Sequence, residues 1–176
     1  MIRLKNIVLI GMPGSGKSTI GARLAKNLHY PLIDTDRLIM DTTGHTLPEL
    51  LQIRGLEGFL ALEGQVGAQL ACEGCVIATG GSMVLSETAM RNLKRESVTV
   101  WLDTALTELE RRIRANADRG IAAKPGTTIE EIDAVRRPLY ARYADIHLHT
   151  AGSVGHMVAQ LMEALQAYPL DEARMR

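Results

Sequence analysis

The segment with the clearest chemistry is a glycine-rich stretch near the amino end of the chain, which reads Gly11-Met-Pro-Gly-Ser-Gly-Lys17-Ser18. It matches the Walker A pattern, in which glycines allow successive backbone amides to turn inward around the β-phosphate of a nucleotide. In this pattern Lys17 bridges the β- and γ-phosphates, and the Ser18 hydroxyl is a ligand of Mg²⁺. We therefore predict a site for ATP with Mg²⁺. The predicted nucleotide-binding residues here are Gly11, Gly14, Ser15, Gly16, Lys17, Ser18 and Thr19.

Two carboxylates end the second apolar run of the chain, in the segment Ile33-Asp34-Thr35-Asp36. If that strand continues through them, both side chains point the same way. Beside a phosphate-binding loop, such a pair could serve Mg²⁺ and accept a proton from an attacking hydroxyl. Aspartate is also favoured as a helix cap at a strand–helix junction, so for Asp36 a catalytic role and a capping role are both open.

Arginines in the second half of the chain are suited to binding anionic groups. Arg112 and Arg119 fall on a helix and a loop that could close over the nucleotide, where a guanidinium can stack on adenine or neutralise phosphoryl charge. For Arg112, the run Arg111-Arg112-Ile113-Arg114 favours instead a solvated helix face. The segment Arg136-Arg137-Pro138 places two guanidinium groups before a proline in a helical stretch, and their planar shape suits a carboxylate or a phosphate.

Strands and helices must bring these residues together at one edge of a sheet. Apolar runs of strand length alternate with segments of helical spacing, and they cover residues 4–10, 30–33, 76–78, 98–102 and 146–149. Because these runs are continuously apolar, they predict a parallel sheet with helices on both faces, in a single domain over residues 1–176. Ligands of such folds bind beyond the carboxyl ends of the strands. Those ends fall at Gly11, Asp34–Asp36, Gly80-Gly81 and Asp103.

Two capping boxes mark the starts of helices. Thr46-Leu-Pro-Glu49 predicts a long helix running toward Leu70, and Thr128-Ile-Glu-Glu131 predicts another running toward Tyr143. A further helix is expected over residues 154–167. The segment 116–127, just before the second capping box, lacks periodicity and carries glycine and proline. We expect it to be a lid over the site.

Composition excludes several other classes of protein. Twenty basic and twenty acidic residues give a formal net charge of zero, and aromatic residues are 3% of the chain, so a nucleic-acid-binding protein is not expected. Apolar runs are too short to span a bilayer and no signal peptide is evident, so we expect a cytoplasmic protein.

Cys72 and Cys75 form a lone Cys-x-x-Cys pair, and we expect two ordinary reduced cysteines. The expected partner is a small-molecule substrate, and the expected state is a monomer.

The order of these motifs resembles that of the shikimate kinases over nearly the whole chain. The shared pattern begins with the Gly11–Ser18 loop and Ile33–Asp36, and it continues through Phe59, Leu62-Glu63, Thr79-Gly80-Gly81, Arg112, Arg119, Arg136-x-Pro138-Leu139-Tyr140 and Ala144-Asp145. The resemblance implies a three-layer P-loop kinase fold with five parallel strands in the order 2-3-1-4-5. It also implies a lid near 116–127 and an acceptor-binding region near 34–65.

The resemblance further implies a role for each matching residue. Asp36 would hold the shikimate hydroxyls and act as the base, and Asp34 would sit near magnesium. Gly80 and Gly81 would contact the substrate through their backbone amides, and Arg136 would bind its carboxylate. Arg119 would be the lid arginine, and Arg112 would lie against adenine.

The acceptor half of the pattern departs from the family. The family has an arginine directly after the phenylalanine, where it pairs with the shikimate carboxylate, whereas this chain reads Phe59-Leu60. A charge-assisted hydrogen bond to a buried carboxylate is worth roughly 1.5 to 3 kcal/mol. In addition, Ser82 replaces the third family glycine, and Arg119-Gly120-Ile121 replaces the usual Arg-Pro-Leu-Leu of the lid. Arg37, Arg54 and Arg137 are the candidates to replace the missing cation.

Three hypotheses follow. The first is phosphoryl transfer from MgATP to shikimate, with Lys17, Asp36 and Arg119 as the catalytic residues. The second keeps the mechanism but takes a related hydroxylated metabolite that lacks a carboxylate on the Leu60 side. The third is a non-catalytic nucleotide-binding protein that acts through partners, and the retained Asp36 and Arg119 argue against it.

Overall fold

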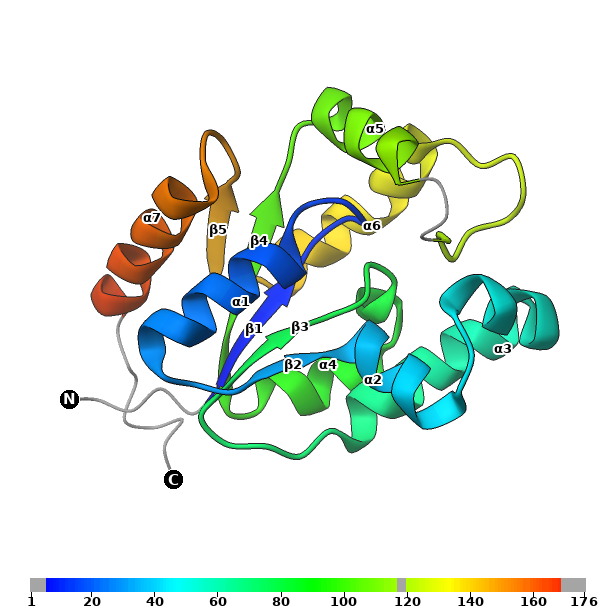
Figure 1. The fold of residues 1–176 in the computed structure, drawn as a ribbon, viewed down its shortest axis with the longest axis horizontal. Coiled ribbons are helices and arrows are strands. Elements are labelled where there is room, and N and C mark those ends of the chain that lie inside the picture. The colour runs from blue at the N-terminus through cyan, green and yellow to red at the C-terminus, as the bar shows by residue number, and fades with distance from the viewer. Residues whose placement is uncertain (1–5, 117–119, 169–176) are drawn as a thin grey trace.

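The structure is a computed structural model that describes residues 6–116 and 120–168. Its strands form one parallel sheet at the centre of the fold. The five strands are ordered β2-β3-β1-β4-β5, which confirms the expected order (Figure 1). Their bounds are Asn6–Ile10 for β1, Leu32–Asp34 for β2, Cys75–Ala78 for β3, Ser97–Asp103 for β4 and Ile146–His149 for β5. The three central strands β3, β1 and β4 are mostly apolar because both of their faces are covered.

The register of the strands aligns the ends that carry polar residues. Ile10 at the end of β1 pairs with Trp101 of β4, and Asp34 at the end of β2 pairs with Ala78 at the end of β3. All pairings are parallel, so the loops that follow β1, β2 and β3 leave the sheet along the same edge. This edge is the ligand-binding edge expected of an open parallel sheet.

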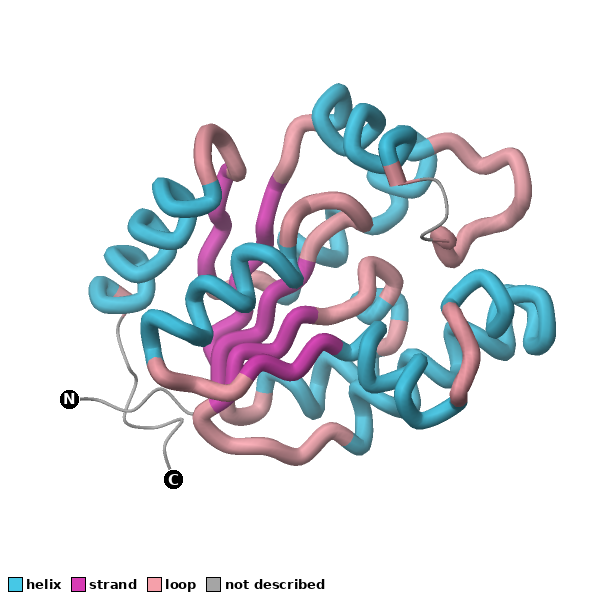
Figure 2. Tube along the Cα trace, in the orientation of Figure 1, coloured by secondary structure: helices cyan, strands magenta, loops and turns pink. Residues whose placement is uncertain are grey.

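Helices cover both faces of the sheet (Figure 2). Their bounds are Lys17–Leu28 for α1, Thr35–Thr43 for α2, Leu47–Gln69 for α3, Glu87–Lys94 for α4, Leu106–Ala115 for α5, Ile129–Tyr143 for α6 and Val154–Ala167 for α7, with a 3₁₀ turn η1 at Met83–Leu85. One apolar cluster joins α1 and α7 to one face through residues such as Leu24 and Leu161. Another joins α4 and α6 to the opposite face through residues such as Met90 and Tyr140.

The predicted helix starts are confirmed. Thr46 and Glu49 form a complete capping box at the start of α3, and Thr128 and Glu131 do the same for α6. Helix α3 breaks at Gly55, which has a φ of 69° that glycine adopts readily. Helices α2 and α4 were not predicted. None of the helices in the described ranges is long and apolar enough to cross a membrane.

The second strand does not continue through Asp36, so the condition under which the two carboxylates would point the same way is not met. Strand β2 ends at Asp34, and α2 begins at Thr35. The Asp34 carboxylate accepts hydrogen bonds from the backbone N–H groups of Asp36 and Arg37, at 3.1 and 3.3 Å. The capping role therefore belongs to Asp34, and Asp36 projects from the first turn of the helix.

Candidate active site

The glycine-rich loop packs against the neighbouring strand and turns back on itself before α1. A Cβ atom on Gly11 would lie 2.7 Å from the Leu102 carbonyl oxygen, so the loop backbone passes too close to β4 for a larger residue. Gly14 and Gly16 have φ values of 83° and 93°, which L-residues rarely adopt. These three glycines fix the loop in front of the amino terminus of α1, where backbone N–H groups and the helix dipole favour an anion.

The Lys17 side chain is folded across this loop. It is only 8% exposed, and its Nζ donates to the carbonyl oxygens of Gly11 at 2.7 Å and Met12 at 2.8 Å. These contacts hold the ammonium group at the mouth of the phosphate-binding loop. The lysine is therefore placed where a nucleotide phosphate would meet it.

Ser18 and Asp34 meet beside the loop. The Ser18 hydroxyl donates to Asp34 Oδ2 at 2.5 Å, which joins the first turn of α1 to the end of β2. A hydroxyl and a carboxylate are oxygen donors of the kind that Mg²⁺ prefers. The two residues predicted to serve the metal are thus adjacent, and their donor set fits that ion.

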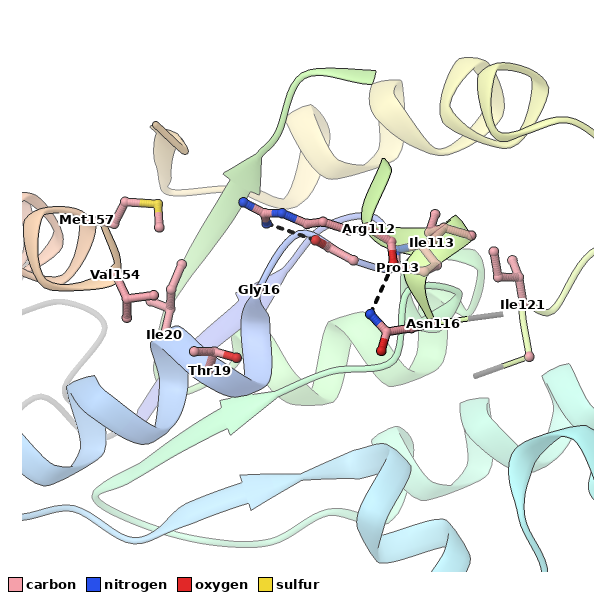
Figure 3. Close-up of a pocket in the computed structure, with 12 residues that line it drawn as sticks. Pro13, Gly16, Thr19, Ile20, Arg112, Ile113, Asn116, Ile121, Val154 and Met157 are labelled. Carbon is pink, nitrogen blue, oxygen red and sulfur yellow. Dashed lines mark hydrogen bonds between the residues drawn. The ribbon is translucent and has the colours of Figure 1, made fainter. Parts of the chain in front are cut away.

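A cavity of about 500 Å³ opens on the α5 and α7 side of the loop (Figure 3). Its apolar wall includes Ile20, Ile113 and Met157. Arg112 also lines it and donates from Nη1 to the Gly14 carbonyl oxygen at 3.0 Å. The simple reading of Arg112 as part of a solvated helix face is therefore wrong. The volume, the apolar wall and the neighbouring loop suit a purine nucleoside.

A second, smaller cavity of about 70 Å³ lies on the other side of the loop, toward α2 and α3. It is polar and receives side chains from separate parts of the chain: Lys17, Ser18, Asp36, Phe59, Glu63, Thr79, Ser82 and Arg136. Both cavities are lined by Pro13, Gly14 and Gly16, so they adjoin at the phosphate-binding loop. A group bound in one could therefore reach a group bound in the other.

Two carboxylates approach the backbone of Gly80. A Cβ atom at this position would lie 1.9 Å from Glu63 Oε1 and 2.7 Å from Asp36 Oδ1, so only glycine leaves room for both. The Gly80 N–H itself donates to Thr35 Oγ1 at 2.9 Å. This bond corrects the expectation that the Gly80 amide contacts the substrate, because that donor is already used. Gly81 lines the small cavity, and its carbonyl oxygen accepts from the Tyr140 hydroxyl at 2.6 Å.

Glu63 is the site residue that sequence reasoning did not assign. It is 1% exposed, and it accepts a hydrogen bond from the Ser82 hydroxyl. Burial raises the pKa of Glu63 to about 7, and the nearby Asp36 carboxylate adds to the rise while Ser82 and Arg136 oppose it. The motif Leu62-Glu63 indicated that this residue belongs to the family pattern. It did not indicate burial, because burial depends on how α3 packs against residues 80–82.

Arg136 brings a guanidinium group to the small cavity. It is 3% exposed, and its Nη2 donates to the Ala122 carbonyl oxygen at 2.7 Å. Its Nη1 is also buried, and no hydrogen-bond partner for it lies among residues 6–116 and 120–168. A buried guanidinium nitrogen with no acceptor is costly, so this atom is suited to receive an anionic group.

None of the three arginines considered as substitutes for the missing family arginine lines the small cavity. Arg37 is exposed and pairs with Asp41 at 2.8 Å, and Arg137 pairs with Asp103 and Asp133, each at 2.9 Å. Arg54 is exposed on α3. Leu60 packs against an apolar cluster that includes Ile39 and Phe59. Among the described residues, Lys17 and Arg136 are the cations that line the cavity, and Arg119 lies outside the described ranges.

Known proteins share both this sequence and this fold. The model of the shikimate kinase family matches residues 13–166. The shikimate kinase of Rhodococcus erythropolis is 40% identical over 164 residues, which cover 90% of this chain and 96% of that protein. That of Symbiobacterium thermophilum is 37% identical over 167 residues, which cover 92% and 96%. The structure of the Acinetobacter baumannii enzyme in complex with shikimate aligns with a TM-score of 0.87 at 27% identity, covering 96% of each chain.

The family model covers the phosphate-binding loop from Pro13 onward and the region around Arg136, and the alignments with the two relatives span 96% of each of them. Family membership therefore rests on the whole chain and not on the loop alone. This chain belongs to the shikimate kinase family of phosphotransferases.

Proposed function

We propose that this protein transfers the γ-phosphoryl group of ATP to a hydroxyl of shikimate, giving shikimate 3-phosphate and ADP. The observation that carries the proposal is the small cavity beside the phosphate-binding loop. Asp36, Lys17 and Arg136 all line it, and Arg136 presents a buried donor that has no partner within the part of the chain that the structure describes. A hydroxylated carboxylic acid would offer a hydroxyl to Asp36 and a carboxylate to Arg136, and Lys17 would meet the transferring phosphoryl group of ATP.

Asp36 is the proposed base. It projects from the first turn of α2 into the cavity that Lys17 and Ser18 also line. As the substrate oxygen bonds to the γ-phosphorus and the bond to the bridging oxygen of ADP breaks, Asp36 accepts the hydroxyl proton. Lys17 and, we propose, Arg119 stabilise the charge on the transferring group.

Ser18 and Asp34 are the proposed residues for Mg²⁺. The ion would supply charge neutralisation at the β- and γ-phosphates. Asp34 also caps α2, so the same carboxylate orients the helix turn that carries Asp36. Arg112, Thr19 and the loop glycines would hold the nucleotide, and the volume of the large cavity fits its base and sugar.

Arg136 is the proposed carboxylate-binding residue. The free Nη1 atom gains an acceptor when a carboxylate binds, and charge-assisted bonds of this kind are the stronger ones. Nη2 is already tied to Ala122, which fixes the guanidinium plane. We propose Gly81, and not Gly80, as the glycine in contact with the substrate.

A test is the release of ADP by the purified protein with MgATP, measured with and without shikimate. We expect shikimate to accelerate ADP release, and phosphorus NMR to show a phosphate monoester of shikimate. Asp36→Asn should lose at least about 100-fold in kcat, whereas Asp41→Asn, on the exposed side of α2, should not. No acceleration by shikimate would overturn the proposed acceptor.

A second candidate is the same reaction on a hydroxylated metabolite without a carboxylate on the Leu60 side. The observation in its favour is that Leu60 packs into an apolar cluster and brings no cation to the cavity. A screen of small hydroxylated acids and polyols for ADP release would reveal this activity. The candidate requires one of them to exceed shikimate in kcat/KM.

A further inference from the structure

A group of three potential metal ligands lies at the carboxyl ends of β4 and β5, outside the two cavities. His147 and His149 are two apart on β5, so their side chains share one face of the sheet. Asp103 ends β4 and pairs in register with His149. His147 Nε2 lies 2.8 Å from Asp103 Oδ2, and His149 Nδ1 lies 3.4 Å from the same oxygen.

The donor atoms have a spacing that suits one ion. One ligand atom from each residue lies within 4.8 Å of the other two. In a tetrahedral zinc site with bonds of about 2.0 to 2.1 Å, ligand atoms are about 3.3 Å apart. The His147 and His149 side chains are 42% and 78% exposed, so small rotations of the imidazoles can bring all three atoms to that spacing.

The surroundings hold the carboxylate in place and leave a net negative charge. Arg137 donates to both oxygens of Asp103, at 2.9 and 3.2 Å, which fixes the plane of the carboxylate. Asp133 pairs with the same arginine and offsets its charge. The formal charges of Asp103, Asp133 and Arg137 sum to −1. Hydrogen bonds to a ligating carboxylate are typical of metal sites.

We propose that His147, His149 and Asp103 form a binding site for a late first-row transition metal ion, with Zn²⁺ the best fit. Two imidazoles and one carboxylate are a ligand set that zinc accepts, and the exposed side of β5 leaves the fourth position to water. The ion joins the edge strand β5 to β4. The site is independent of phosphoryl transfer, because none of its three ligands lines either cavity.

Calorimetric titration with Zn²⁺ tests the site. The full chain without an affinity tag is used, in millimolar Mg²⁺ so that oxygen ligands near Ser18 are occupied by the harder ion. We expect one Zn²⁺ per chain, and a loss of affinity of about tenfold or more in His149→Ala and in His147→Ala. His156→Ala, on α7, is the matched control and should bind as the parent does. Equal affinity in all four proteins, or no binding by the parent, would overturn the proposal.

Two readouts locate the ion independently. Trp101 is the single tryptophan, and its ring stacks on His147 with centroids 4.1 Å apart. Paramagnetic Cu²⁺ should therefore quench its fluorescence in the parent and much less in His149→Ala. Zn²⁺ should also raise the melting temperature of the parent but not of His149→Ala, since only a ligand of the folded state stabilises it. Quenching and stabilisation that persist in the variant would place the ion elsewhere.

Discussion

The donor side and the acceptor side of the site are built in different ways. The donor side comes mainly from one continuous segment, residues 11–18, in which backbone geometry and three glycines shape the phosphate-binding loop. The acceptor side is assembled from side chains on α2, α3, α6 and the turn at residues 80–82. A change in the first alters one loop, whereas a change in the second alters packing between elements. We therefore propose that one local segment recognises the phosphate and that the tertiary fold is needed to recognise the acceptor.

The largest effect is expected on the donor side, from Lys17→Met. The change removes the cation held at the mouth of the loop and should lower kcat by at least about 100-fold for any acceptor. Steady-state ADP release with each active acceptor measures it. Lys26→Met, in the last turn of α1, is the control and should retain activity. A variant that keeps more than a tenth of the parent kcat would contradict the assigned role.

The next largest effect is on stability, from Glu63→Gln on the acceptor side. Because burial raises the pKa of Glu63 from 4.5 to about 7, folding favours its protonated form. Its stabilising contribution is present below about pH 4.5 and is lost as the pH rises through about 7, by an amount on the order of 3 kcal/mol. Glutamine does not titrate, so the variant should lack this decline.

Urea unfolding at pH 5 and pH 8 measures the difference between the two proteins. The free energy of unfolding of the parent should fall relative to that of Glu63→Gln as the pH rises. Glu57→Gln, on an exposed position of the same helix, should follow the parent. Identical pH dependence in the parent and Glu63→Gln would show that Glu63 is ionised throughout this range.

Leu60→Arg should make the acceptor side more like that of the family. A guanidinium at this position adds a partner for the substrate carboxylate, and we expect the KM for shikimate to fall about tenfold. Steady-state kinetics with shikimate varied at saturating MgATP measure the change. Leu60→Met keeps an apolar side chain and serves as the control. An unchanged or higher KM for shikimate would mean that the carboxylate does not face Leu60.

The smallest effect is expected at the edge of the nucleotide cavity, from Arg112→Ala. The side chain contacts Gly14 and lines the large cavity, so we expect a severalfold rise in the KM for ATP with little change in the KM for shikimate. Arg114→Ala, an exposed position of the same helix, should leave both unchanged. A rise confined to the KM for shikimate would exclude a nucleotide role for Arg112.

The same contrast explains what the sequence could predict. The apolar strands and the two capping boxes are local patterns, and the structure has a strand or a helix start at each, apart from residues 4 and 5 of the first expected strand, which lie outside the described residues. The sequence around Asp34 and Asp36 is compatible both with a longer strand and with a helix that Asp34 caps. It therefore did not show that the strand ends at Asp34. The burial of Glu63, the internal bond of Gly80 and the contact of Arg112 with the loop arise from packing between distant segments.

We propose that Arg136 is the cation that recognises the acceptor carboxylate in this chain. The most direct test compares shikimate with its methyl ester, in the parent and in Arg136→Met. We predict that loss of the carboxylate charge lowers kcat/KM of the parent about tenfold or more, and that the variant uses the two compounds equally. A parent enzyme that uses the ester as well as shikimate would contradict the claim, as would a variant that still distinguishes them as strongly as the parent does.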